Sequence, residues 1–250
     1  NLVIDNSNLN SQYIAFTDAD CIVDKKWILT LYNSIKDTDK TIAGAGGRRL
    51  VAKTRNKKET VINTLLTSQI ASGGNPAFAT RKIKYTKSIA NYNAIYKKDI
   101  ISKFRYDEKL IISDDNELNY RLRKSGYYFI NVPKAMVWHY ETSSIMEFAN
   151  NMFKYGINIT NTVKKHRNII TINVPITLIF IFYLISIIPL YYILGSYIFI
   201  PLLFYIIFTI SVFLEVFIKT KTIYSLYIFI LLPIQHISYG LGVIWNLTYK

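Results

Sequence analysis

The last third of the chain carries almost no charge. From residue 168 onward the sequence is dominated by Ile, Leu, Phe and Tyr, and its charged residues are one glutamate and three lysines, Glu215, Lys219, Lys221 and Lys250. The hydrocarbon core of a bilayer takes about 20 apolar residues per helix, and this stretch is long enough for three such helices. It therefore predicts an all-α transmembrane domain over residues 169–250, with three helices at about 170–194, 197–218 and 223–247.

Basic residues flank the predicted spans unevenly. Lys164, Lys165 and Arg167 precede the first span, and Lys219 and Lys221 separate the last two, whereas the turn between the first two has no charge. Lys and Arg concentrate on the cytoplasmic side of membrane proteins. The pattern predicts a multi-pass protein of the cell membrane whose amino-terminal part is cytoplasmic.

The residues before 168 have the mixed composition of a soluble α/β domain, with 27 Lys and Arg against 15 Asp and Glu. This excess of positive charge fits contact with membrane lipids or with a phosphorylated substrate, and equally a lysine-rich solvated surface. We do not expect nucleic acid as a partner. The single cysteine, Cys21, excludes an internal disulfide and a cysteine-based metal cluster. We assign residues 1–143 to this domain, and 144–168, where apolar residues recur at helical spacing, to an amphipathic segment on the membrane surface.

The sequence predicts a short apolar strand that ends in two carboxylates. In YIAFTDADC, residues 13–21, the β-forming residues YIAF are followed by Asp18 and Asp20. Ligands of α/β folds bind at the carboxyl ends of strands. Mg²⁺ is typically held by one or two carboxylates together with phosphate oxygens of the substrate. Asp-x-Asp also occurs in solvated turns and helix caps, but the strand context favours a Mg²⁺ or Mn²⁺ site that bridges to a diphosphate.

A second acidic cluster begins the helix that we predict over residues 112–126. Asp114, Asp115 and Glu117 lie in its first turn, where acids favour the helix dipole, and Gly126 ends it. Capping requires only one of these acids, which leaves another for catalysis. The two clusters together suggest that one neutralises a leaving diphosphate while a carboxylate of the other takes a proton from an attacking hydroxyl. At a sugar carbon, a single base opposite the leaving group inverts the configuration.

The glycine-rich run TIAGAGGRRLV, residues 41–51, invites comparison with a phosphate-binding loop. It lacks the spacing of such loops and the Gly-Lys-Ser/Thr ending. We therefore predict a strand with close backbone approaches, from which Arg48 and Arg49 could still reach a phosphate.

Six motifs in a fixed order carry a family resemblance: YIAFTDADC, YNAIYKKD, FRYDEKL, DDNELNYRLRKSGYYFINVP, WH and FKYG. Residues 13–167 thereby resemble the family 2 glycosyltransferases with the GT-A fold, and most of all the membrane-bound branch that builds polysaccharides and lipid-linked sugars. The resemblance implies a partial GT-A domain with a Rossmann-like mixed sheet, followed here by the predicted transmembrane helices. It also implies an inverting, metal-dependent hexosyltransferase that uses a UDP- or GDP-sugar and a lipid-linked or cell-envelope polysaccharide acceptor.

Each motif implies a role for particular residues. Asp18 and Asp20 match the carboxylates that bind the metal and the nucleotide sugar, with Asp20 as the direct ligand, and Asp115 matches the catalytic base, with Asp114 beside it. The remaining matches are Asn93 and Arg121 on the donor side, Gly73, Gly74 and Asn75 in the acceptor loop, Lys154 and Tyr155 at the acceptor entry, and His139 near the metal or diphosphate. A lone histidine is more often a packed and hydrogen-bonded residue, so His139 is also open to this second interpretation.

Two departures from the family pattern leave alternatives open. Processive members carry Gln-x-x-Arg-Trp where this chain has MFKYG at residues 152–156, so single addition and processive synthesis both stay open. The strands that hold the nucleotide base have no counterpart before Tyr13, and we expect the chain to be part of a longer enzyme. The alternative function is a non-catalytic, membrane-anchored docking partner of another glycosyltransferase. A transporter ranks third, because the apolar stretch has few polar groups.

Overall fold

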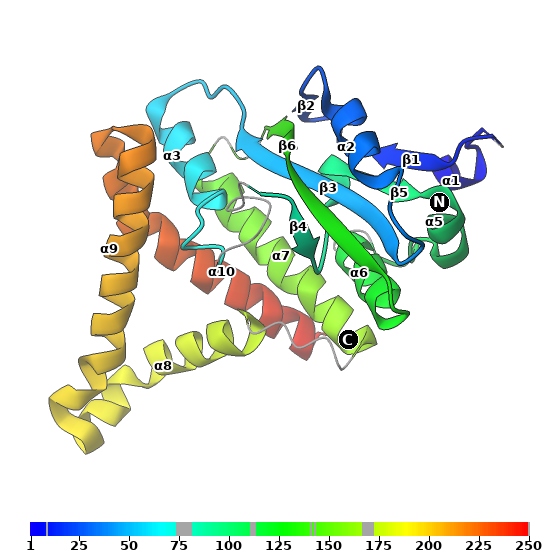
Figure 1. Ribbon diagram of the computed structural model, residues 1–250. Helices are drawn as coiled ribbons and strands as arrows, with labels where there is room; N and C mark the ends of the chain where they lie inside the picture. Colours follow the sequence, from blue (N-terminus) through cyan, green and yellow to red (C-terminus); the bar gives the residue numbers. More distant parts are fainter. Residues whose placement is uncertain are drawn as a thin grey trace. The chain divides into compact units, whose positions relative to one another are not determined.

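The computed structural model describes residues 1–8, 10–73, 82–110, 114–140, 142, 144–166 and 173–249. The chain divides into two compact units, one made of Asn1–Lys53 and Ser72–Glu141, the other of Thr54–Ala71 and Thr142–Lys250. The first unit contains the sheet, and the second contains the long helices (Figure 1).

Within the described residues, six strands form one mixed sheet in the order β1-β5-β3-β6-β2, with β4 beside β6. The strands are β1 (Tyr13–Phe16), β2 (Cys21–Val23), β3 (Ile42–Val51), β4 (Lys84–Thr86), β5 (Ala94–Lys97) and β6 (Tyr128–His139). Strands β3 and β6 pair in parallel, and the other pairs are antiparallel. The predicted mixed α/β sheet is therefore confirmed.

The glycine-rich run forms the central strand β3, as predicted, and not a phosphate-binding loop. Its glycines allow neighbouring segments to approach the backbone closely. A Cβ atom at Gly47 would lie 1.9 Å from the carbonyl oxygen of Ala135, and one at Gly46 would lie 2.7 Å from the side chain of Ile89. Larger residues at these positions would push the sheet apart.

Helices cover both faces of this sheet. Helix α2 (Trp27–Ile35) buries Leu31 and Ile35 against one face, while α5 (Lys98–Phe104) and α6 (Asp114–Lys124) pack against the other, together with the short α1 (Leu2–Asp5). Strand β5 follows the 3₁₀ turn η1 (Asn91–Asn93), and its side chains alternate between the two cores. Helix α6 stops before Gly126, which has φ of +89°, a left-handed conformation that favours glycine.

The second unit consists of helices. They are α3 (Lys57–Leu66), α7 (Ile145–Lys165), α8 (Asn173–Leu194), η2 (Gly195–Phe199), α9 (Ile200–Thr220), η3 (Ile223–Tyr227) and α10 (Ile228–Thr248). Helices α7 and α10 run side by side in Figure 1. A Cβ at Gly156 of α7 would lie 2.0 Å from the Tyr239 carbonyl oxygen, and one at Gly242 of α10 would lie 2.1 Å from that of Phe153. The two backbones therefore touch, as glycines allow in membrane helix pairs.

The prediction of three membrane spans is corrected to two. Among the described residues, two stretches are long and apolar enough to cross a membrane, Val174–Thr220 and Ile223–Thr248. The predicted break at Gly195 and Ser196 is present as a turn: Gly195 has φ of +59°, and α8 and α9 leave η2 in different directions in Figure 1. The 3₁₀ turns of η2 follow α8 directly and lead into α9, so the two helices belong to one apolar stretch.

The segment predicted to lie on the membrane surface forms α7, which extends to Lys165. Part of its apolar face is used inside the protein, since Phe148 and Met152 are buried in a core with Val61 of α3 and Leu231 of α10. A location on the membrane surface stays a prediction.

Hydrogen bonds to the Glu215 carboxylate attach residues 54–71 to the helical unit. Its carboxylate on α9 accepts hydrogen bonds from the Ser68 hydroxyl at 2.5 Å and from the backbone amides of Gln69 at 2.8 Å and Ile70 at 3.0 Å. Lys219 lies one turn further along α9 and pairs with the same carboxylate at 2.5 Å. These four partners compensate a charge that would otherwise be costly in an apolar helix.

Candidate active site

The predicted acidic pair and the predicted histidine meet where β2 joins β6. The antiparallel register places Cys21 opposite His139, and the Tyr140 amide donates to the Asp20 carbonyl oxygen at 3.0 Å. The Nε2 atom of His139 lies 3.7 Å from Oδ1 of Asp20 and 3.9 Å from Oδ2 of Asp18. The structure therefore brings His139 next to an acidic pair that lies far from it in the sequence.

The contacts of His139 orient its ring. Nδ1 lies 2.8 Å from the backbone carbonyl oxygen of Tyr140, so Nδ1 carries the hydrogen and Nε2 presents its lone pair to the carboxylates. The His139 ring packs edge-on against the Tyr92 ring, with the two ring centroids 5.1 Å apart. The Arg49 guanidinium lies over the Tyr92 ring, 5.5 Å from its centroid. Burial and the nearby charge of Arg49 lower the pKa of His139, which keeps the imidazole neutral.

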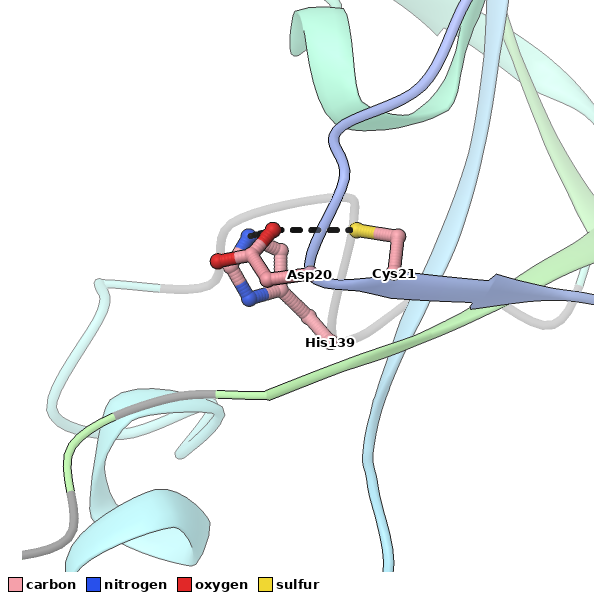
Figure 2. A group of neighbouring side chains, drawn as sticks. All are labelled: Asp20, Cys21 and His139. Atoms are coloured by element: carbon pink, nitrogen blue, oxygen red, sulfur yellow. Dashed lines mark hydrogen bonds and ion pairs between the residues drawn. The ribbon is translucent and has the colours of Figure 1, made fainter.

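Cys21 completes a cluster of possible metal ligands. In Figure 2 the side chains of Asp20, Cys21 and His139 point toward one another, and one ligand atom from each lies within 4.8 Å of the others. The Cys21 Sγ atom lies 3.9 Å from Oδ1 of Asp20. Carboxylate oxygens suit Mg²⁺ and Mn²⁺, while imidazole and thiolate suit softer ions. This donor set fits a divalent cation.

The second acidic cluster begins α6, as predicted. Burial and the neighbouring charge of Asp114 raise the pKa of Asp115 to about 6, although the Asn116 amide donates to its Oδ1 at 2.7 Å. Asp18 also raises the pKa of Asp115. Burial, Asp20 and Asp114 in turn raise the pKa of Asp18. The two acidic clusters are therefore close enough to act on each other electrostatically.

Sequence reasoning missed Tyr106, Tyr92 and Asn91 at this site. The Tyr106 hydroxyl donates to the side-chain oxygen of Asn91 at 2.8 Å, and burial together with Asp114 and Asp115 raises its pKa. The motifs FRYDEKL and YNAIYKKD contain Tyr106 and Tyr92, but nothing in their spacing assigns the two tyrosines to the acids or to His139.

Asn93, predicted on the donor side, is buried behind the site. Its Oδ1 accepts from the indole of Trp27 at 2.8 Å, and its Nδ2 donates to the carbonyl oxygens of Arg48 at 3.2 Å and Ala135 at 3.0 Å. The β3–β6 register shifts between Gly47 and Arg48, so the Asn93 amide satisfies carbonyls beside this irregularity. Donor contact by Asn93 stays a prediction.

Arg121, the other predicted donor-side residue, lies on α6 and binds within the first unit. Its Nε is 2.9 Å from both carboxylate oxygens of the buried Glu117, and its terminal nitrogens donate to the carbonyl oxygens of Phe104 at 2.5 Å and Arg105 at 2.6 Å. This guanidinium holds α6 to the end of α5. Its contact with a diphosphate also stays a prediction.

The predicted acceptor-side residues are placed only in part. Gly73 has φ of +64°, and Gly74 and Asn75 lie outside the described residues. Lys154 and Tyr155 are exposed on α7 of the second unit.

Comparison with known proteins identifies a family whose model spans both acidic clusters and the sheet that holds them. The family model described as glycosyl transferase family group 2 matches residues 13–234, a range that includes both acidic clusters and His139. A search of curated proteins gave no match. Because the family model covers most of the chain, including the mixed sheet with its converging acids, the chain belongs to glycosyl transferase family group 2 and is a transferase of glycosyl groups.

Proposed function

We propose that this transferase is an inverting, metal-dependent hexosyltransferase. It takes a sugar from a UDP- or GDP-sugar and adds it to a lipid-linked or cell-envelope polysaccharide acceptor at the cytoplasmic face of the cell membrane. The observation that carries the proposal is the convergence of two acidic clusters. Asp18 and Asp20 face His139, the charge of Asp18 raises the pKa of Asp115, and the charge of Asp114 raises the pKa of Asp18.

Asp20, Asp18 and His139 form the donor side of the proposed site. They would hold Mg²⁺ or Mn²⁺, which when bound neutralises the negative charge of a leaving diphosphate. Arg49 places a positive charge beside His139, and this charge is close enough to lower the pKa of the imidazole. A diphosphate bound next to His139 would therefore lie close to the positive charge of Arg49.

Asp115 serves as the base in this proposal. Its carboxylate takes the proton of the acceptor hydroxyl while the hydroxyl oxygen forms a bond to the anomeric carbon and the bond from that carbon to the diphosphate breaks. A single displacement of this kind inverts the anomeric centre. The raised pKa of about 6 makes Asp115 a stronger base than an ordinary aspartate and still leaves it charged at neutral pH.

The apolar helices support a membrane acceptor. Two stretches of the described chain are long and apolar enough to cross a bilayer. An acceptor on a lipid carrier is confined to the membrane surface, and confining the enzyme to the same surface raises their effective concentration. Membrane lipids are then partners of the second unit.

The test is transfer from a panel of UDP- and GDP-sugars by the lipid-embedded protein with Mg²⁺ or Mn²⁺. The Asp115→Asn variant should lose about 10²- to 10⁴-fold in rate, the usual contribution of a general base. The matched control is Asp37→Asn, which changes an exposed carboxylate after α2. Equal turnover by the wild type and Asp115→Asn would remove Asp115 as the base. Turnover by neither protein would favour the alternative function, a non-catalytic docking partner of another glycosyltransferase.

A further inference from the structure

The ligand atoms around Asp20 already have the spacing of a small coordination shell. A tetrahedral ion with bonds of about 2.0–2.3 Å places neighbouring ligand atoms roughly 3.3–3.8 Å apart. The observed separations from Oδ1 of Asp20 are 3.7 Å to Nε2 of His139 and 3.9 Å to Sγ of Cys21. All three ligand atoms lie within 4.8 Å of one another, near enough for side-chain adjustment to bring them onto one ion.

The backbone holds two of these ligands in position. Cys21 and His139 are directly opposed in the β2–β6 ladder, so their separation is set by strand pairing rather than by a loop. The Tyr140 carbonyl oxygen fixes Nδ1 of His139 as the donor and leaves Nε2 as the ligand atom. Asp18 provides a further carboxylate oxygen at 3.9 Å from the same Nε2.

We infer that Cys21 is a ligand of the cation bound by Asp20 and His139, and that its sulfur makes this site prefer a thiophilic divalent ion such as Zn²⁺ or Co²⁺ over Mg²⁺. The inference rests on the proposed metal dependence but adds a residue and a selectivity to it. On binding, the S–H bond of Cys21 breaks, the sulfur–metal bond forms, and the proton leaves to solvent. No electron is transferred and no other reactant is needed.

Selectivity follows from the donor set. Mg²⁺ prefers oxygen ligands in near-octahedral geometry and gains little from a sulfur atom. Thiolate and imidazole together favour Zn²⁺, and Mn²⁺ ranks lowest among the first-row divalent ions in affinity for nitrogen and sulfur sites. Zn²⁺ should therefore displace Mn²⁺ from the wild-type protein at far lower concentration than from a variant without the thiol.

The experiment is a Co²⁺ titration of the whole chain in detergent, followed by absorption spectroscopy. Cobalt bound to a thiolate has a sulfur-to-metal charge-transfer band in the near ultraviolet, and Cys21 is the single cysteine of the sequence, so the band reports on this residue alone. We expect the band in the wild type and in the control Asp37→Asn. We expect Cys21→Ser to lack it while retaining the melting temperature of the wild type.

Competition with a chromophoric chelator gives the affinity for Zn²⁺. Cys21→Ser should bind Zn²⁺ at least 10- to 100-fold more weakly, the range that loss of even an outer partner costs a metal site. Cys21→Ala provides a second variant in case the serine hydroxyl coordinates the ion. Bound cobalt without the sulfur band, or Zn²⁺ affinity unchanged in both variants, would overturn the inference.

The readout separates this inference from the proposed function, because the band needs no donor and no turnover. Transfer activity in a protein whose cobalt form lacks the band would leave the transferase proposal intact and remove Cys21 from the metal site. The band in a protein that transfers no sugar would support the ligand and count against the proposed reaction.

Discussion

At the residue scale, the site depends on carboxylates held close together at some electrostatic cost. Burial and Asp114 raise the pKa of Asp115 to about 6, whereas an aspartate in an unfolded chain titrates near 3.9. The folded protein therefore favours the protonated form. The stability contributed by this shift is fully present below the unfolded pKa and is lost as the pH rises through the folded pKa. The charged base that catalysis requires thus costs the fold stability.

The same shift predicts the pH dependence of transfer. With the metal saturating, kcat/KM should rise with pH through about 6 as Asp115 loses its proton. Asp114→Asn removes a neighbouring negative charge and should move this acidic limb to lower pH. Initial rates between pH 4.5 and 8 would measure the midpoints, with Asp99→Asn as the exposed control. A limb that does not move in Asp114→Asn would contradict the assignment of the base.

Arg121 offers a test of two roles for one residue. Arg121→Gln should destabilise the fold by about 3–5 kcal/mol, because it removes the guanidinium that pairs with the buried Glu117 carboxylate at 2.8 Å. Thermal unfolding in detergent would measure the loss, and Arg123→Gln, an exposed position on the same helix, should change the melting temperature little. An unchanged melting temperature with a raised KM for the donor would instead favour the diphosphate role.

At the element scale, close packing of α7 on α10 defines the second unit. Gly156 and Gly242 each face backbone of the other helix, so neither obstacle can rotate away as a side chain would. A polar contact also holds this unit together: the Glu215 carboxylate on α9 accepts three hydrogen bonds from the turn after α3. Both contacts join segments that are distant in sequence.

Gly156→Ala should lower the melting temperature of the protein. Its Cβ would lie 2.0 Å from the Tyr239 carbonyl oxygen, and such overpacking costs about 1–3 kcal/mol. Alanine recovers about 1 kcal/mol of helix propensity over glycine, so we expect net destabilisation. Met146→Ala on the exposed side of α7 is the control. A melting temperature equal to or above that of the wild type would show that the helices are not in close contact here.

At the scale of the whole molecule, the longer apolar stretch exceeds one membrane crossing. Val174–Thr220 has 47 residues, and a straight helix of that size is about 70 Å long, against a hydrocarbon core of about 30 Å. In Figure 1, α8 and α9 leave η2 in different directions. We predict that η2 lies on the side of the membrane opposite the cytoplasmic first unit proposed above, because η2 carries no charged residue while Lys164 and Lys165 lie in the last turn of α7.

Cysteine labelling tests this topology. In the Cys21→Ser background, Ser196→Cys within η2 should react with a membrane-impermeant maleimide added to intact cells, because residue 196 is exposed. Ser125→Cys, an exposed position in the first unit, should react only after the cells are opened. Labelling of Ser125→Cys in intact cells would place the first unit outside and contradict a cytoplasmic catalytic domain.

Local patterns in the sequence determined much of this protein. Apolar residues followed by Asp18 and Asp20 predicted a strand with acids at its end, and the acids before Leu118 with Gly126 after it predicted α6. Each is a signal that lies within one segment, where hydrophobic period, helix dipole and glycine conformation operate. The resemblance rested on the same segments, and membership of the glycosyltransferase family is confirmed.

The tertiary structure decided how these segments meet. The pairing of Cys21 with His139, the use of Asn93 beside the β3–β6 irregularity and the attachment of Ser68 to Glu215 all join residues far apart in the chain. The 3₁₀ turns of η2 likewise join α8 and α9 into one apolar stretch, where the sequence predicted two separate spans. Strand register and helix contacts depend on the packing of the complete fold, so no local pattern contains them.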